Sequence, residues 1–277
     1  MRVYTALIPE QPGEKTLEAY LAHAMPLLPY FVIRDAFEKR DVKMNGIRAQ
    51  ADAVPVGNAE VKVYTNWEAK LPVVFEDDQI LLINKPAGIS CEDDGRGGMT
   101  VQGILAGRAA ICHRLDNQTC GLLIAAKTRE AEECLLKAFN DRTLTKKYEC
   151  IVKGIVRPPA QTATAYILRD DQLGRMRIVS HASPEAKPVA TAYETISVQQ
   201  DTTRLLVTLL TGRTHQIRAH LSALQHPILG DDVYGDRAFN QRKNVRRLML
   251  CATELTLNAG DCLSYLDGRV FSIKAPF

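Results

Sequence analysis

Two short polar segments, about a hundred residues apart, carry the side chains best suited to chemistry. Residues 113–116 read His-Arg-Leu-Asp and come just before the apolar run at 122–126. Residues 212–218 read Gly-Arg-Thr-His-Gln-Ile-Arg and follow the apolar run at 205–210. If both apolar runs are strands of one sheet, Asp116 can meet an arginine of the second segment in a cleft. A carboxylate held ionised by such a neighbour can attack carbon rather than exchange protons.

Each of these side chains also has an ordinary structural role open to it. Asp116 is either a nucleophile or a turn acid that caps the next residues or pairs with Arg114. Arg213 either holds the pKa of Asp116 low, so that the acid stays charged, or forms a structural ion pair with it. The residues alone leave both alternatives open.

A third candidate region combines an aromatic side chain with cations. Tyr148 follows Lys146 and Lys147, so it can stack on a base while the cations hold phosphate. The alternative is a core tyrosine with a satisfied hydroxyl. The net charge of the chain is only +3, but residues 204–247 hold eight basic and three acidic side chains. That excess is either a surface that faces phosphate or a solvated face.

The sequence lacks the signatures of metal, nucleotide and redox-cofactor sites. Its seven cysteines form no C-x-x-C pair, and no carboxylate stands at ligand spacing from His220 or His226, so we expect no metal. We interpret these two histidines and His215 as structural. Neither a phosphate-binding glycine loop nor a dinucleotide fingerprint occurs, so we expect no cofactor. The G-x-S-x-G elbow of serine hydrolases is absent as well.

Compartment and solubility follow from similar reasoning. The cysteines lie largely in apolar surroundings, as free thiols in a reducing compartment do. We find neither a signal peptide nor an apolar run long enough to cross a bilayer. We therefore expect a soluble, cytoplasmic protein with no membrane partner.

The chain is expected to fold as two domains, of which the first is a small module at residues 1–66. Apolar residues at helical spacing predict two helices, near 17–24 and 32–37, with Thr16 as the N-cap of the first. Asn45-Gly46 between alternating residues predicts a hairpin, and a strand near 61–64 closes the module.

Residues 71–277 form the second, strand-rich domain, after a linker that begins at Trp67. A helix capped by Thr128 is expected there, and the glycines at 95, 97 and 98 predict a mobile loop. Short strands in succession with few helices favour an α+β fold with a mixed, mainly antiparallel sheet. The expected strands lie near residues 73–75, 80–84, 147–152, 165–168, 175–179 and 190–196.

Four motifs in order resemble those of the RluA-type RNA pseudouridine synthases, and the likeness spans about residues 71–275. Ordered motifs together are far more specific than any one of them. Residues 1–65 resemble, less closely, a small RNA-binding module of a ribosomal small-subunit protein. The four motifs are residues 83–88, 113–123, 147–154 and 212–218, the last continued by 226–235.

The resemblance implies that the protein isomerises uridine in structured RNA without a metal or cofactor. Asp116 matches the catalytic aspartate, which attacks the anomeric carbon, assists loss of uracil from it, or acts through a glycal route. Tyr148 matches the tyrosine that stacks on the uracil and is the candidate to take the proton from carbon five. Arg213 matches the arginine that pairs with the aspartate, and Arg114 the side chain that fills the gap left by the extruded uridine.

Further expectations concern substrate and partners. We expect His113, Lys146, Lys147 and Arg218 to contact the RNA, which is ribosomal RNA rather than transfer RNA, and we expect a monomer. One rival interpretation is a catalytically silent RNA-binding or ribosome-assembly factor on the same scaffold. Another is a nucleoside or glycoside hydrolase that uses Asp116, for which the sequence offers no second catalytic acid.

Overall fold

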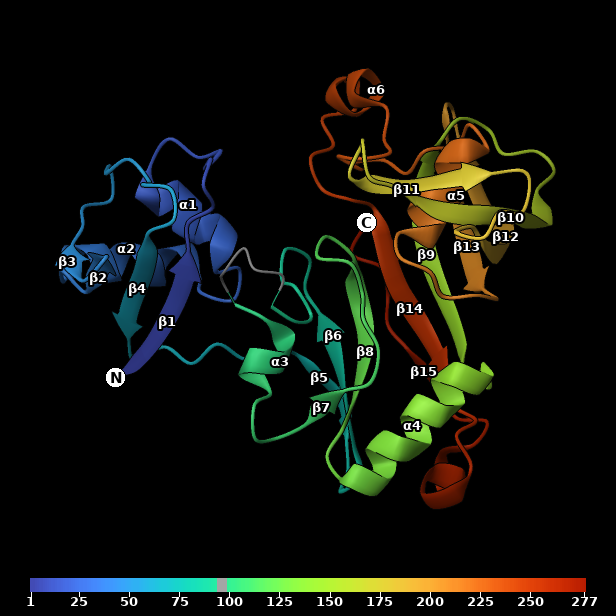
Figure 1. Cartoon of the computed structure of the whole chain (residues 1–277), viewed down its shortest axis with the longest axis horizontal. Coiled ribbons are helices and arrows are strands. Elements are labelled where there is room, and N and C mark those ends of the chain that lie inside the picture. Colours follow the sequence, from blue (N-terminus) through green and yellow to red (C-terminus); the bar gives the residue numbers. More distant parts are fainter. Residues whose placement is uncertain (94–98) are drawn as a thin grey trace. The chain divides into compact units, whose positions relative to one another are not determined.

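The computed structural model describes residues 1–93 and 99–277, which form two compact units (Figure 1). The first unit holds residues 1–117 and 123–127, and the second holds 118–122 and 128–277. Strand β8 (Cys120–Ala126) therefore begins in the second unit and ends in the first. The predicted glycine loop at 95, 97 and 98 lies outside the described residues.

The N-terminal part of the first unit is a four-stranded sheet, in the order β1-β4-β2-β3, with two helices packed against it. The Thr16 side chain caps the first helix as predicted, by accepting a hydrogen bond from the N–H of Ala19. The predicted hairpin is also present, with positive φ at Asn45 and Gly46, as a tight turn of this kind requires. Strand β1 was not predicted. The elements are β1 (Arg2–Leu7), α1 (Leu17–Ala24), α2 (Tyr30–Glu38), β2 (Val42–Met44), β3 (Ile47–Arg48) and β4 (Glu60–Thr65).

The rest of the first unit carries the Asp116 segment. Strand β6 (Ile80–Lys85) pairs with β5 (Val73–Glu76), and its four consecutive apolar residues are fully buried. Such a run is typical of a strand that is covered on both faces. Strand β7 (Ala110–Ile111) pairs with the end of β8 just before the Asp116 segment, and α3 (Val101–Ile104) precedes it.

The second unit is built on an antiparallel sheet in the order β11-β10-β12-β13-β9-β14. Strand β14 also pairs with β15 and, in parallel, with the first residues of β8. The sheet is therefore mixed and mainly antiparallel, which confirms the predicted fold class. Its strands are β9 (Thr145–Lys153), β10 (Ala160–Asp170), β11 (Arg175–Val179), β12 (Lys187–Gln199), β13 (Thr202–Leu209), β14 (Leu250–Thr256) and β15 (Val270–Ser272).

Few helices accompany this sheet. The Thr128 side chain caps α4 (Arg129–Asp141), and the predicted apolar face of that helix is buried. The others are α5 (Gln216–Ala223), α6 (Arg237–Arg242) and the 3₁₀ helix η1 (Asp261–Leu266). Among the helices that the structure describes, none combines the length and apolar character that crossing a membrane requires.

Candidate active site

Asp116 lies in a loop whose backbone is fixed on both sides. The N–H of buried Leu115 donates to the Sγ of Cys91 (3.3 Å), and the thiol of Cys91 donates to the carbonyl of Leu115 (3.4 Å). On the other side, the carbonyl of Asn117 accepts from the N–H of Gly88 (2.9 Å). The half-buried Asp116 is thus presented from an anchored loop, as a side chain that must meet a reacting atom has to be.

Lys85 is a part of this loop that the sequence reasoning did not single out. It is fully buried, and its ammonium donates to the carbonyls of Pro86 (3.1 Å), Ile89 (2.8 Å) and Asn117 (3.1 Å). A buried charge is costly unless it is hydrogen-bonded, and these carbonyls meet that need. Lys85 therefore ties the residue after Asp116 to the end of β6. A lysine that ends an apolar strand directly before a proline was the signal for it.

His113 and Arg114, both predicted to contact RNA, have different surroundings. The Nε2 of His113 accepts a hydrogen bond from the N–H of Ile124 (3.2 Å), so the ring is neutral and its proton is on Nδ1. Arg114 is 69% exposed and pairs with exposed Glu92 at 3.2 Å. An exposed pair of this kind contributes little, so RNA can replace it at small cost.

Tyr148 and Lys146 lie on the face of the second unit's sheet that α5 covers. Tyr148 is opposite Val207, which in turn is opposite Tyr193. Thr191 shares the face of Tyr193, and its hydroxyl makes hydrogen bonds with two side chains of α5, both at 3.0 Å. Since directly opposite residues of paired strands point to the same side, Tyr148 and Lys146 face the α5 layer as well.

Lys146 also reaches the segment that carries Arg213. A β-carbon on Gly212 would lie 3.7 Å from the Nζ of Lys146, and this ammonium stands 5.2 Å from the ring centre of Phe139. Burial lowers the pKa of Lys146 below its ordinary value. Lys146 is half-buried, and a second cation beside Arg213 favours an anionic partner at this position.

Lys147 points to the opposite face. Alternation along β9 separates it from Tyr148, and its ammonium pairs with Glu254 of β14 at 2.7 Å. Lys146 and Lys147 therefore cannot flank one phosphate beside Tyr148 as the sequence suggested. Period-two alternation was visible in the sequence and could have separated them.

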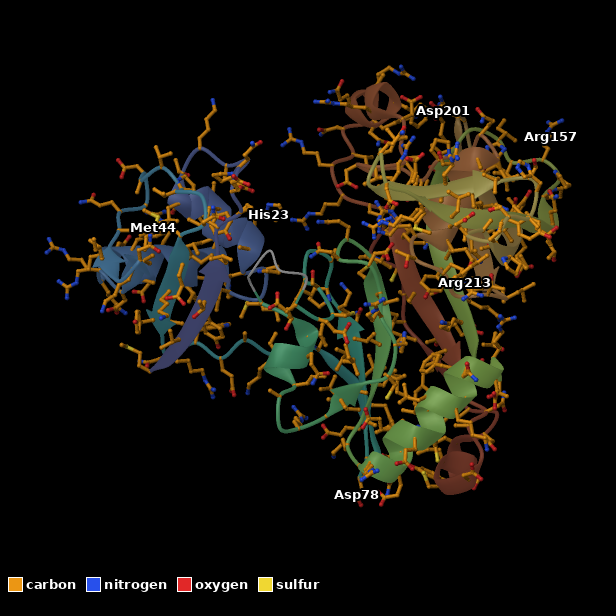
Figure 2. The ribbon with its side chains drawn as sticks, viewed as in Figure 1. His23, Met44, Asp78, Arg157, Asp201 and Arg213 are labelled. Atoms are coloured by element: carbon orange, nitrogen blue, oxygen red, sulfur yellow. The ribbon has the colours of Figure 1, made fainter. Side chains whose placement is uncertain are left out.

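Arg213 is labelled in Figure 2, and the turn that carries it is fixed by the buried side chain of Gln216. Its Oε1 accepts from the hydroxyl of Thr211 (2.8 Å) and from the N–H of Arg213 (3.1 Å), while its Nε2 donates to the carbonyl of Ala190 (3.1 Å). His215, which precedes α5, adopts a left-handed conformation with φ of 54°. The backbone at Arg213 is therefore held by one amide against β12.

The guanidinium of Arg213 is incompletely satisfied. Its Nε is buried, and no atom in the described part of the chain accepts a hydrogen bond from it. A buried donor without an acceptor is rare in native proteins and calls for a specific explanation, of which a catalytic role is one. The planar guanidinium matches a carboxylate or a phosphate. This side chain is therefore suited to neutralise an oxyanion next to the Tyr148 face, the side of the sheet that bears Tyr148 and is covered by α5.

Arg218, predicted to contact RNA, is buried in an ion pair. It donates to Asp231 at 2.8 and 2.9 Å and to Asp232 at 3.1 Å, and its side chain is 5% exposed. Burial of Asp231 raises its pKa, but the bonds from Arg218 and from the N–H groups of Val233 and Tyr234 outweigh burial and hold this pKa below its ordinary value. Arg218 thus fixes the segment after α5 and offers RNA little surface.

The three histidines of the last motif region contact protein groups. The Nδ1 atoms of His215, His220 and His226 lie 3.1, 3.0 and 3.0 Å from a tyrosine hydroxyl, a threonine hydroxyl and a backbone carbonyl. Burial lowers the pKa of His220, so its ring is neutral at pH 7. Within residues 1–93 and 99–277, no group of three His, Cys, Asp or Glu side chains is placed to hold a metal ion.

The first residues of β8 bring the Asp116 motif to the sheet that bears Tyr148. Gly121 has φ of 118°, and a β-carbon there would lie 2.3 Å from the carbonyl oxygen of Ala252. Ala252 is opposite Tyr148 on the next strand. Asp116 itself belongs to the first unit, and Arg213 to the second. Their contact therefore stays a prediction.

Comparisons with known proteins agree with the motifs. Residues 79–223, which include Asp116, Tyr148 and Arg213, match the family model described as RNA pseudouridylate synthase. A protein named ribosomal large subunit pseudouridine synthase D from Vibrio cholerae is 40% identical over 196 residues, which are 65% of this chain and 58% of that protein. Its namesake from Haemophilus influenzae is 33% identical over 83% of this chain and 75% of its own length.

A solved structure is also similar. The structure named human RNA pseudouridylate synthase domain containing 1 has a TM-score of 0.61 and 26% identity, and the match covers 78% of this chain and 86% of that one. The chain spans little more than half the length of the first curated relatives that it matches.

Proposed function

Because the chain belongs to the RNA pseudouridylate synthase family, we propose that it converts uridine to pseudouridine in large-subunit ribosomal RNA. In this reaction the bond from C1′ of the ribose to N1 of uracil breaks, and C1′ is joined to C5 instead. The proton of C5 is lost, and N1 regains one. The product is an isomer of the substrate, so neither an oxidant nor a reductant takes part.

Asp116 is the proposed nucleophile: its carboxylate bonds to C1′ as uracil leaves, and this ester bond breaks when C5 of the turned uracil attacks C1′. The target uridine must leave the base stack, since a stacked base hides its glycosidic bond. The observation that carries the proposal is the buried Nε of Arg213, which lacks an acceptor within the described residues and stands next to the Tyr148 face. The carboxylate of Asp116 is the acceptor that we propose for it.

Of the other candidate residues, some are proposed to contact the RNA and others to position the site. We propose that Tyr148 stacks on the detached uracil and takes the C5 proton, and that Lys146 balances the negative charge of that ring. Exposed Arg114 fills the space that the extruded uridine leaves in the RNA. Lys85 and Arg218 act as positioning residues, because their polar atoms are engaged with buried protein groups.

Substrate and setting follow from the relatives. Both curated relatives described above carry names that refer to the ribosomal large subunit, so ribosomal RNA is the proposed substrate in preference to transfer RNA. We propose a cytoplasmic location, because both relatives come from bacteria, in which ribosomes are made in the cytoplasm. We propose that it acts as a monomer.

Release of tritium from RNA labelled at C5 of uridine tests the proposal, because the C5 proton leaves only if the base is rejoined at C5. Asp116→Asn should abolish release from ribosomal RNA and leave RNA affinity nearly unchanged, whereas the exposed control Asp78→Asn should behave like the unmodified chain. Retained release by Asp116→Asn would remove Asp116 from the mechanism. An unmodified chain that binds RNA but releases no tritium would favour the silent RNA-binding factor.

A further inference from the structure

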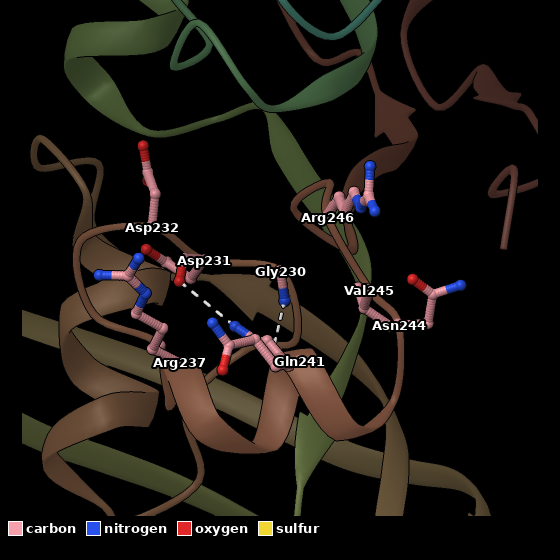
Figure 3. A pocket seen from close by; sticks show the side chains of 10 residues that line it. Gly230, Asp231, Asp232, Arg237, Gln241, Asn244, Val245 and Arg246 are labelled. Carbon is pink, nitrogen blue, oxygen red and sulfur yellow. Dashed lines mark hydrogen bonds between the residues drawn. The ribbon is translucent and has the colours of Figure 1, made fainter. Parts of the chain in front are cut away.

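The described residues of the second unit line an open pocket of about 440 Å³ next to α6 (Figure 3). This volume lies within the range of about 300–1,000 Å³ found for ligand sites. A site for an uncharged small molecule is mostly apolar, but here Val245 is the one apolar side chain of the lining. The pocket is lined by Gly230, Asp231, Asp232, Gly235, Arg237, Asn240, Gln241, Asn244, Val245 and Arg246.

The floor of this α6 pocket is held rigidly. The side-chain amide of Asn240 accepts from the N–H of Gly230 (3.0 Å) and donates to the carbonyl of Asp231 (3.5 Å) (Figure 3). Gly230 has φ of 73°, and a β-carbon there would lie 1.9 Å from the carbonyl oxygen of Arg247. The backbone segments at Gly230 and Arg247 therefore pack directly against each other on this floor.

The acids of the pocket are already engaged. Asp231 accepts two hydrogen bonds from Arg218, and Asp232 accepts a third. Asp236, which caps α6, pairs with Lys153 at 2.6 Å. These carboxylates therefore compensate cations other than the arginines of the pocket wall.

The cations of the wall are not compensated. Arg237 and Arg246 are exposed, and neither forms an ion pair within the part of the chain that the structure describes. Residues 237–247 contain five basic side chains and no acid. Two of them, Arg242 and Lys243, place their charged ends 5.4 and 5.7 Å from the ring centre of the buried Phe239 in α6. Positive charge is thus concentrated around one polar hollow.

We propose that the α6 pocket binds a backbone phosphate of the substrate RNA, outside the nucleotide that is isomerised, and that it contributes to substrate affinity. Arg237 and Arg246 hold the phosphate, since a guanidinium fork fits its oxygens. The amides of Gln241 and Asn244 can bond a neighbouring ribose hydroxyl, which distinguishes RNA from DNA. The inference rests on the proposed function, because the substrate supplies the polyanion. The rim carboxylate of Asp232 repels phosphate and limits the affinity.

Binding of the full chain to a ribosomal RNA fragment, followed against salt concentration, tests this site. The Asp116→Asn background prevents turnover. Arg237→Ala/Arg246→Ala should weaken binding about tenfold and lower the slope of log K against log salt by roughly 0.7–0.9, the value for one neutralised phosphate. The matched control Arg129→Ala/Arg169→Ala removes two exposed arginines outside the pocket and should change neither value.

Further variants separate the site from a folding defect and from another ligand. Arg237→Lys/Arg246→Lys should restore most of the slope but only part of the affinity, since charge is kept and the fork is lost. Asp232→Asn should tighten binding. Equal RNA affinity and equal slope for the alanine double variant and its control would overturn the inference. The inference would also be overturned if the alanine double variant bound RNA normally and lost affinity only for an acidic protein. In the chain that keeps Asp116, the alanine double variant should raise KM and leave kcat unchanged. If the proposed function is wrong, the unmodified chain itself shows no turnover, and the two failures can be told apart.

Discussion

Replacement of Arg218 tests the buried ion pair that fixes the segment after α5. Arg218→Met keeps the length of the side chain and removes its charge. The Asp231 carboxylate, whose side chain is 0% exposed, then retains the N–H groups of Val233 and Tyr234, both at 2.9 Å, but loses two bonds from the guanidinium. A buried anion is left without its counter-charge.

The expected cost follows from this burial. Loss of one partner of a buried pair costs about 3–5 kcal/mol, whereas loss of an exposed pair costs at most about 1 kcal/mol. Arg169→Met, which breaks the exposed pair with Asp171, is therefore the control. For a domain of this size, about 2–4 °C per kcal/mol makes the expected fall in Tm roughly 6–20 °C.

The pH dependence has a definite sign. The pKa of Asp231 is lowered in the folded chain, so its stabilisation is present above about pH 4, the unfolded value, and is lost as pH falls through the folded pKa. The stability difference between the unmodified chain and Arg218→Met should therefore be largest near neutral pH and shrink in acid.

Thermal unfolding followed by circular dichroism measures the effect. The single tryptophan, Trp67, belongs to the first unit and does not report on the second. Arg218→Met/Asp231→Asn should recover part of the lost stability, because no charge is then buried alone. An Arg218→Met chain as stable as the Arg169→Met control at pH 7, or a difference that does not shrink in acid, would refute the reasoning.

Three further predictions concern the active site. Gly121→Ala should destabilise the chain by about 2–4 kcal/mol, because its new methyl meets a strand carbonyl, whereas Gly268→Ala, with open space around it, should cost about 1 kcal/mol in thermal unfolding. Lys146→Met should lower kcat/KM for tritium release about tenfold, or about 1.4 kcal/mol. Lys147→Met, on the opposite face, should change kcat/KM little. A larger loss for Lys147→Met than for Lys146→Met would contradict the assignment of faces. Tyr148→Phe should bind RNA normally but release tritium about 100-fold more slowly, so that an unchanged rate would show that the hydroxyl does no proton transfer.

Local sequence patterns predicted several elements of the fold. The caps Thr16 and Thr128 and the turn at Asn45-Gly46 were predicted because each depends on a few neighbouring residues. Strand β1 was missed because its stability comes from pairing with β4, more than fifty residues later. Pairing over such a distance leaves no local signal.

The site could be predicted in part. The motifs supplied Asp116, Tyr148 and Arg213 as candidates, and their roles stay predictions. Alternation along β9 could have separated Lys146 from Lys147. The burial of Arg218 could not be read from the sequence, since its partner Asp231 stands thirteen residues away across a turn. The same holds for Lys85, whose acceptors are backbone carbonyls that any sequence would supply.

The central claim concerns two side chains that the fold places in different units. The distance between the Asp116 carboxylate and the Arg213 guanidinium, measured in a crystal structure of the chain bound to RNA that contains the target uridine, tests it most directly. We expect a nitrogen-to-oxygen contact within about 4 Å, the range of an ion pair. A separation beyond about 10 Å, at which salt screens the two charges from each other, would contradict the proposed mechanism.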